Sequence, residues 1–190
     1  MSGVNKTINA DGMRVLRDIV DEAIVSLEAV IVARDNVAWG VVRLNTTLGP
    51  VEVRNRIEEL PINDEGEMDE FGVLSVMVAN GAFVVDDVDQ EASVCSLDEM
   101  VTSITLINGR VVTYEDGEAI ADRSYTQAIV FELASCEYLV LDKGAWFSEM
   151  ITINMGPEPS VFISDDSEDW EDDPEEPSIH YGWERAFVRV

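Results

Sequence analysis

The sequence predicts an α+β protein that is mainly β, with antiparallel sheet built from successive hairpins after an N-terminal helix. Helical spacing of apolar residues occurs near the N-terminus, whereas runs rich in Val, Ile and aromatic residues recur between turn residues from Ala38 onward. The connections between these runs are too short for crossover helices, which favours antiparallel pairing. A β-roll or a sandwich with one or two short helices is the alternative fold.

The helix is predicted near residues 11–23, with Asp11 as its N-cap. Its apolar residues follow a spacing of three or four: Met13, Leu16, Val20, Ile24, Leu27 and Ile31. The stretch 24–33 fits a strand equally well, because its content of Val and Ile is high and its apolar run is nearly unbroken. Helix and strand therefore both stay open for these ten residues.

Three hairpins follow in the sequence. The first joins Ala38–Leu44 to Val51–Ile57 through a Gly-Pro turn. The other two carry Asn-Gly, the strongest short hairpin signal, because both residues tolerate the positive φ of a type I′ turn. They are Val73–Val78 with Ala82–Val85 around Asn80-Gly81, and Val101–Ile107 with Arg110–Tyr114 around Asn108-Gly109. Between them, Ser96-Leu97-Asp98-Glu99 has the capping-box pattern and predicts one short helical turn.

The last strands predicted are Thr126–Ala134, Glu137–Leu141, Ala145–Asn154 and Tyr181–Val190. The first three are rich in Ile, Val and aromatic residues, which places them at the centre of the sheet. We expect a single domain over residues 1–190, with two sheet lobes, about 1–90 and 91–190, as the alternative. Two acidic loops are predicted at residues 58–70 and 164–178.

The charge of the chain excludes several kinds of partner. The 190 residues include 39 acidic and 12 basic side chains, for a net charge of −27. Such a field repels DNA, RNA and anionic membranes, and attracts a basic protein. Adaptation to a high-salt cytoplasm would give the same composition without any partner. No signal segment and no apolar stretch of about 20 residues is evident, so a cytoplasmic protein is expected.

The search for catalytic, cofactor and metal motifs predicts none, and therefore a protein that is not an enzyme. The chain has one histidine, His180, no Gly-x-Ser-x-Gly motif and no phosphate-binding glycine loop. Cys95 and Cys136 lack metal-ligand spacing and are expected to be reduced and buried. Glu132 and Glu149 could face a cleft as a carboxylate pair, but solvent-facing positions on amphipathic strands are favoured.

The acidic run near the C-terminus is the predicted partner-binding site. Nine of the twelve residues from Asp165 to Glu176 are Asp or Glu, with Trp170 among them. A tryptophan inside a carboxylate cluster suits a basic groove, because aromatic anchors dominate contact energies and charge steers the approach. The predicted contact residues are Asp165, Asp166, Glu168, Asp169, Trp170, Glu171, Asp172, Asp173, Glu175 and Glu176. In the alternative interpretation, Trp170 folds back onto the sheet.

These observations favour a non-catalytic acidic binding or inhibitor protein that occupies the basic surface of a partner, such as a nuclease or a nucleic-acid-binding protein. The chain is similar in size, charge and lack of catalytic motifs to the immunity proteins and nucleic-acid mimics of bacteria and phages. No motif of a particular family occurs. The alternatives are a structural or accessory β domain that assembles with copies of itself, and a generic acidic protein of a halophile.

Overall fold

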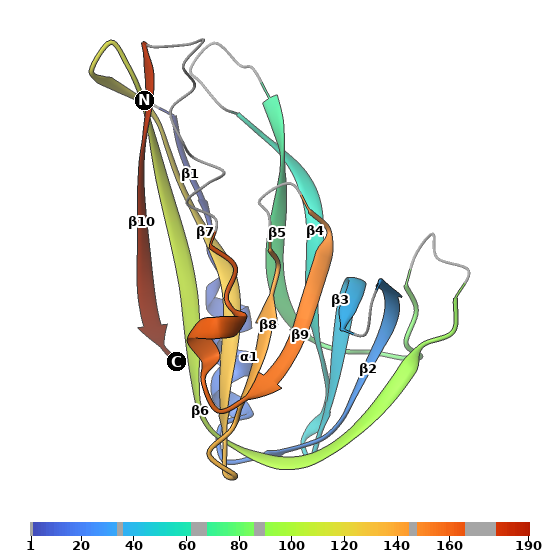
Figure 1. Cartoon of the computed structure of the whole chain (residues 1–190). Coiled ribbons are helices and arrows are strands. Elements are labelled where there is room, and N and C mark those ends of the chain that lie inside the picture. Colours follow the sequence, from blue (N-terminus) through green and yellow to red (C-terminus); the bar gives the residue numbers. More distant parts are fainter. Residues whose placement is uncertain (1, 34–35, 62–67, 86–89, 145–147, 166–177) are drawn as a thin grey trace.

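The computed structural model describes residues 2–33, 36–61, 68–85, 90–144, 148–165 and 178–190. The described elements are β1 (Ser2–Lys6), α1 (Ala10–Asp18), β2 (Ala23–Ala33), β3 (Val37–Thr46), β4 (Gly49–Pro61), β5 (Met68–Val78), β6 (Ser93–Glu115), β7 (Glu118–Leu133), β8 (Tyr138–Asp142), β9 (Met150–Gly156), the 3₁₀ helix η1 (Pro159–Phe162) and β10 (Ile179–Arg189). The protein is thus mainly β with one α-helix near the N-terminus among these residues, as predicted (Figure 1).

The strands form a mixed sheet, so the prediction of an antiparallel sheet is only partly confirmed. β1 pairs in parallel with β7, whereas the other described pairs are antiparallel. Hydrogen-bonded neighbours can be followed from β7 through β8, β9, β3, β2 and β6 back to β7. The sheet therefore curls on itself and encloses the core, while β4 and β5 continue from β3, and β10 is added to β6.

The helix is shorter than predicted and begins earlier. Asn9, and not Asp11, is the N-cap: its side-chain oxygen accepts a hydrogen bond of 2.9 Å from the backbone N–H of Gly12. α1 ends at Asp18, and Asp21 takes a positive φ of 67° before β2 begins. The open question over 24–33 is settled as strand, in line with the β-branched residues of this stretch.

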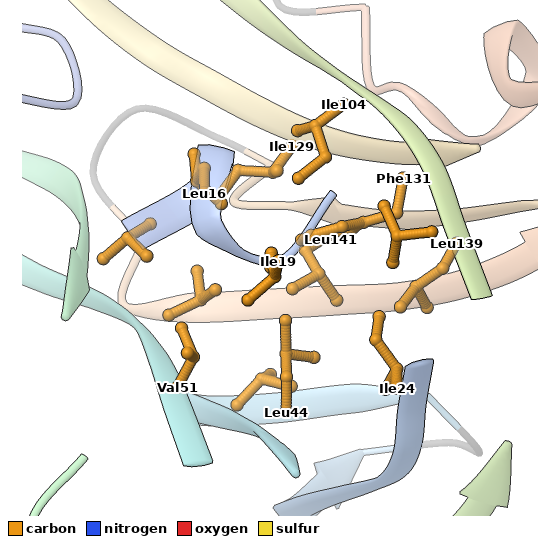
Figure 2. Packing of buried hydrophobic residues seen from close by; sticks show 14 of the residues in the cluster. Leu16, Ile19, Ile24, Leu44, Val51, Ile104, Ile129, Phe131, Leu139 and Leu141 are labelled. Carbon is orange, nitrogen blue, oxygen red and sulfur yellow. The ribbon is translucent and has the colours of Figure 1, made fainter. Parts of the chain in front are cut away.

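The helix closes the core of the curled sheet. Leu16 and Ile19 are 0 % and 2 % exposed, and they belong to one cluster with residues of β2, β3, β7 and β8. Figure 2 shows these two side chains among Leu44, Ile129 and Leu141, which come from facing strands. Burial of this apolar surface is the main term that holds the fold together.

The first predicted hairpin is confirmed as β3–β4, but the Asn80-Gly81 hairpin is wrong. Residues 82–85 form no strand; instead, β5 pairs with β4 along its whole length, from Val51 opposite Val78 to Pro61 opposite Met68. Gly81 does have a positive φ of 88°, and its carbonyl accepts a hydrogen bond from Arg43. The predicted loop 58–70 is consequently shorter, because both of its ends belong to β4 and β5.

The Asn108-Gly109 turn is also wrong, because β6 runs through it to Glu115. Gly109 lies under the ring of Tyr125, where an added Cβ would come within 2.6 Å of the ring atom Cζ. The glycine thus serves close packing, and the chain reverses at Asp116-Gly117, where both φ angles are positive (49° and 83°). The capping-box turn at Ser96–Glu99 is likewise absent: these residues lie in β6, with a register shift against β2 near Asp98, whose φ is 51°.

The later strands lie close to their predicted positions. β7 starts earlier than predicted, at Glu118, and β9 starts later, at Met150; the predicted start of β9 at 145–147 lies outside the described residues. β7 pairs with β1, β6 and β8 and is therefore central, as expected. Both cysteines are exposed, so the prediction of buried thiols is wrong. Within the described ranges, neither helix is long and apolar enough to cross a membrane.

Candidate functional site

Seven positive charges in the described part of the chain are either buried or paired with a carboxylate. Arg43, Arg123 and Lys143 are only 6 %, 5 % and 1 % exposed. Four further cations are engaged in ion pairs with described carboxylates: Lys6 with Glu58 (2.5 Å), Arg14 with Asp11 (3.1 Å), Arg54 with Glu52 (2.6 Å), and Arg110 with both Asp122 (2.8 Å) and Glu184 (2.7 Å). Most of the outward-facing charge is therefore carboxylate. The excess of negative over positive charge is relatively larger on the surface than in the composition as a whole.

The buried ion group around Glu52 joins β3 to β4. Arg43 donates hydrogen bonds of 3.1 and 2.6 Å to one Glu52 oxygen, and Arg54 donates bonds of 2.9 and 2.6 Å to the other. Burial disfavours the charged carboxylate, but the hydrogen bonds from the two arginines outweigh it and lower the pKa of Glu52. Arg43 also lies over the ring of Phe83, 5.1 Å from its centroid. This group stabilises the fold and carries no reactive side chain.

Lys143 is buried against aromatic rings at the end of β8. Its Nζ lies 4.7 Å from the ring centroid of Tyr125 and 5.7 Å from that of Phe71. The adjacent Asp142, 1 % exposed, accepts hydrogen bonds from the backbone N–H and hydroxyl of Ser164 (2.7 and 2.5 Å). These contacts fix the chain just before the acidic run to the sheet.

Arg123 of β7 is a further buried cation, and its guanidinium donates a 3.5 Å hydrogen bond to the hydroxyl of Thr113 on β6. Burial lowers the pKa of its guanidinium, while the charges of Tyr181 and Asp69 act in the other direction. Packing brings the same strands together, because Phe71 of β5 and Tyr125 of β7 share a buried cluster against which Tyr181 of β10 packs. The two hairpins that end in acidic residues are therefore neighbours in space.

Carboxylates, all exposed except the half-buried Asp69, gather at the end of the sheet where these hairpins meet, and we call this group the acidic end. It consists of Glu58, Glu59, Asp69 and Glu70 from β4 and β5, and Glu115, Asp116 and Glu118 from the tip of β6–β7. Cross-strand register places Glu59 opposite Glu70, and Glu115 opposite Glu118. Like charges directly opposite one another destabilise a sheet. These two pairs therefore lower the folding stability of the protein when no partner is bound.

The acidic end also contacts Ser178, the first described residue after the acidic run of the sequence. The backbone N–H of Asp116 donates a 3.0 Å hydrogen bond to the carbonyl of Ser178, the residue just before β10. In Figure 1 the tip of β6–β7, the start of β10, the N-terminus and the ends of β4 and β5 lie together at the top of the molecule. Ser178, which follows the acidic run by two positions in the sequence, is thus held at the acidic end.

Of the predicted partner-binding residues, the structure describes one, Asp165, which is exposed. The others, Asp166, Glu168, Asp169, Trp170, Glu171, Asp172, Asp173, Glu175 and Glu176, lie outside the described residues. The carboxylates from β4 and β5 lie within the predicted acidic loop 58–70, whereas those at the tip of β6–β7 were not singled out from the sequence. The Asp116-Gly117 dipeptide between two β-rich runs was the signal that could have placed a charged turn there.

Glu132 and Glu149 do not form a shared cleft. Glu132 accepts a 2.6 Å hydrogen bond from the hydroxyl of Ser103, whereas Glu149 lines a separate cavity of about 320 Å³ beside Trp39 and Arg56. Among the residues that the structure describes, no three His, Cys, Asp or Glu side chains are grouped so that they could hold a metal ion.

Comparison of the chain with protein-family models, with curated proteins and with solved structures gives no match. The chain can therefore be classed only by its fold and surface, as an acidic, mainly β protein with a curled mixed sheet and a carboxylate-rich end.

Proposed function

We propose that this chain is a non-catalytic acidic binding protein that occupies a basic surface of a protein partner, in the manner of immunity proteins and nucleic-acid mimics. The observation that carries the proposal is the unequal placement of charge. Three cations are buried and four others are ion-paired, while most carboxylates face outward and several of them lie at the acidic end. Such a field attracts a cationic surface over distance and aligns it before contact.

The partner that suits this surface is rich in Arg and Lys, such as a nuclease or a nucleic-acid-binding protein. The exposed side chains of Glu115, Asp116 and Glu118 at the hairpin tip offer acceptor oxygens to guanidinium groups, which bind carboxylates in bidentate geometry. The acidic run with Trp170, which the sequence attaches to Ser178, would extend this contact and supply its aromatic anchor. The cytoplasm is the proposed compartment, where the two free thiols would stay reduced.

Neutralising the acidic end should weaken binding of a cationic probe about tenfold, since an energy of about 1.4 kcal/mol is shared among four charges. The variant combines Glu59→Gln, Glu70→Gln, Glu115→Gln and Glu118→Gln, all at exposed positions. The probe is a nona-arginine peptide, and the measurement is isothermal titration at low and at physiological salt. The affinity should fall with rising salt, and less steeply for the variant.

A matched control changes the net charge by the same four units elsewhere on the surface. It combines Asp18→Asn, Asp21→Asn, Asp98→Asn and Glu158→Gln, again at exposed positions. We expect this control variant to bind the peptide nearly as tightly as the wild type. Equal losses in both variants would mean that only net charge matters and that the acidic end is no site.

Self-assembly is the second candidate, because β10 leaves one side of the sheet open. Among the described strands, β10 pairs only with β6, and it exposes Phe187 and Val188 (68 % and 37 %). An exposed edge strand with apolar side chains is a template for pairing with another chain. Light scattering that shows a salt-insensitive oligomer, lost on Phe187→Lys, would favour this function over capture of a basic partner.

A further inference from the structure

A second concave feature lies inside the curl of the sheet, away from the acidic end, and we call it the apolar pocket. It has a volume of about 400 Å³ and is walled by β2, β6, β8 and β9. Its apolar lining includes Leu27, Ala29, Leu97, Leu139, Ile153 and Met155. Pockets of a few hundred Å³ with mostly apolar walls are the usual form of small-molecule sites.

The topology explains why the core is open here. The β3–β9 pairing spans three residue pairs and ends where Thr152 meets Val37, so β9 continues beyond the start of β3. Ile153 and Met155 therefore extend past the β2–β3 hairpin and face β6 across a gap. The floor of the pocket is buried, with Leu139 and Ala29 only 1 % and 3 % exposed, whereas the rim exposes Val94 and Met155 (65 % and 50 %).

An apolar rim around an apolar cavity stands out in a chain of net charge −27. Among the residues that the structure describes, no Asp, Glu, Lys, Arg or His lines the apolar pocket. Its polar groups are neutral, chiefly the amides of Asn36 and Asn154, which are joined by a 2.5 Å hydrogen bond. An anionic ligand would meet both this uncharged wall and a repulsive field, and a cation would lose hydration without finding a carboxylate.

We propose that the apolar pocket binds an uncharged, mainly apolar small molecule that carries at most one or two hydrogen-bonding groups. The cavity volume limits the occupant to a small molecule, and the neutral lining sets its charge. The amides of Asn36 and Asn154 are placed to meet its polar group. This site is independent of the proposed capture of a basic protein and can hold when that proposal fails.

The chain carries a built-in reporter for occupancy of this pocket. Cys95 lies in the pocket wall, and Cys136 lies in the turn between β7 and β8, outside the lining. Both thiols are exposed and free, so each reacts with a maleimide in the empty protein. A ligand in the apolar pocket should protect Cys95 and leave Cys136 unchanged on the same molecule.

The experiment uses two dyes that differ in one charged group, the neutral N-phenyl-1-naphthylamine and its sulfonated analogue 8-anilinonaphthalene-1-sulfonate. We expect the neutral dye to bind with increased fluorescence, and the sulfonate to bind at least about tenfold more weakly. The neutral dye should slow maleimide labelling of Cys95, as followed by peptide mass spectrometry, with the labelling rate of Cys136 unaltered.

One variant at the rim and one control variant away from it locate the binding. Met155→Glu places a carboxylate at the pocket, and Met100→Glu places one at a position of similar exposure (50 % against 47 %) that does not line it. The first should weaken the neutral dye about tenfold and abolish protection of Cys95, while the second should do neither. Failure of the neutral dye to bind, equal protection of both thiols, or equal effects of the two variants would each overturn the proposal.

Discussion

Glu52→Gln should lower the free energy of unfolding by about 3 to 5 kcal/mol, because it removes the charge that compensates a buried arginine. Arg43 is 6 % exposed and makes two hydrogen bonds to Glu52. The remaining carboxylate nearby, Glu28, lies 3.9 Å from Arg43, beyond hydrogen-bonding distance. Urea unfolding at neutral pH, followed by circular dichroism, measures the change.

The pH dependence of this difference has a defined sign. Since the folded state holds the pKa of Glu52 below its ordinary value of 4.5, its contribution is complete above that value and is lost as the pH falls through the folded pKa. The wild type and the variant should thus converge in stability in acid. Glu70→Gln, at an exposed position of the neighbouring strand, is the control and should change stability by less than about 0.5 kcal/mol. A pH-independent difference between wild type and Glu52→Gln would contradict the ion-group account.

Leu16→Ala should destabilise the protein by about 2 to 5 kcal/mol, because it opens a cavity where the helix closes the core. Leu16 is fully buried in the cluster that also contains Leu44, Ile129 and Leu141 (Figure 2). The neighbouring Arg17→Ala replaces an exposed residue of the same helix and should be nearly neutral. Thermal unfolding of the two variants in parallel gives the comparison. Equal, small effects would show that α1 is not part of the core.

The sequence predicted those elements whose determinants are local. The helix near the N-terminus and the strands around residues 38–57 and 126–142 follow from apolar periodicity and β-branched content. The turns were harder to predict, because Asn108-Gly109 and Asp116-Gly117 are both dipeptides that favour a tight hairpin turn. Tyr125 decides between them by packing on Gly109 across β6 and β7, and no local pattern reveals that contact.

The sign of the surface could be predicted, but not its arrangement. Composition gives an acidic surface, whereas the inward placement of Lys143 depends on Tyr125 and Phe71, which are distant in the sequence. The acidic end forms only because β4–β5 and β6–β7 finish at the same end of the sheet. Cys95 is exposed in the wall of the apolar pocket. That pocket forms between strands that are distant in the sequence, so no local pattern predicts the exposure of this thiol.

The most direct test of the central claim is a map of where a cation-rich chain docks. Hydrogen–deuterium exchange with and without nona-arginine at physiological salt provides it. The account predicts slowed exchange at the β6–β7 tip, at the start of β10 and at the adjoining ends of β4 and β5. Protection spread evenly over the surface, or confined to strands far from these hairpins, would contradict it and leave the charge as a property of the whole surface.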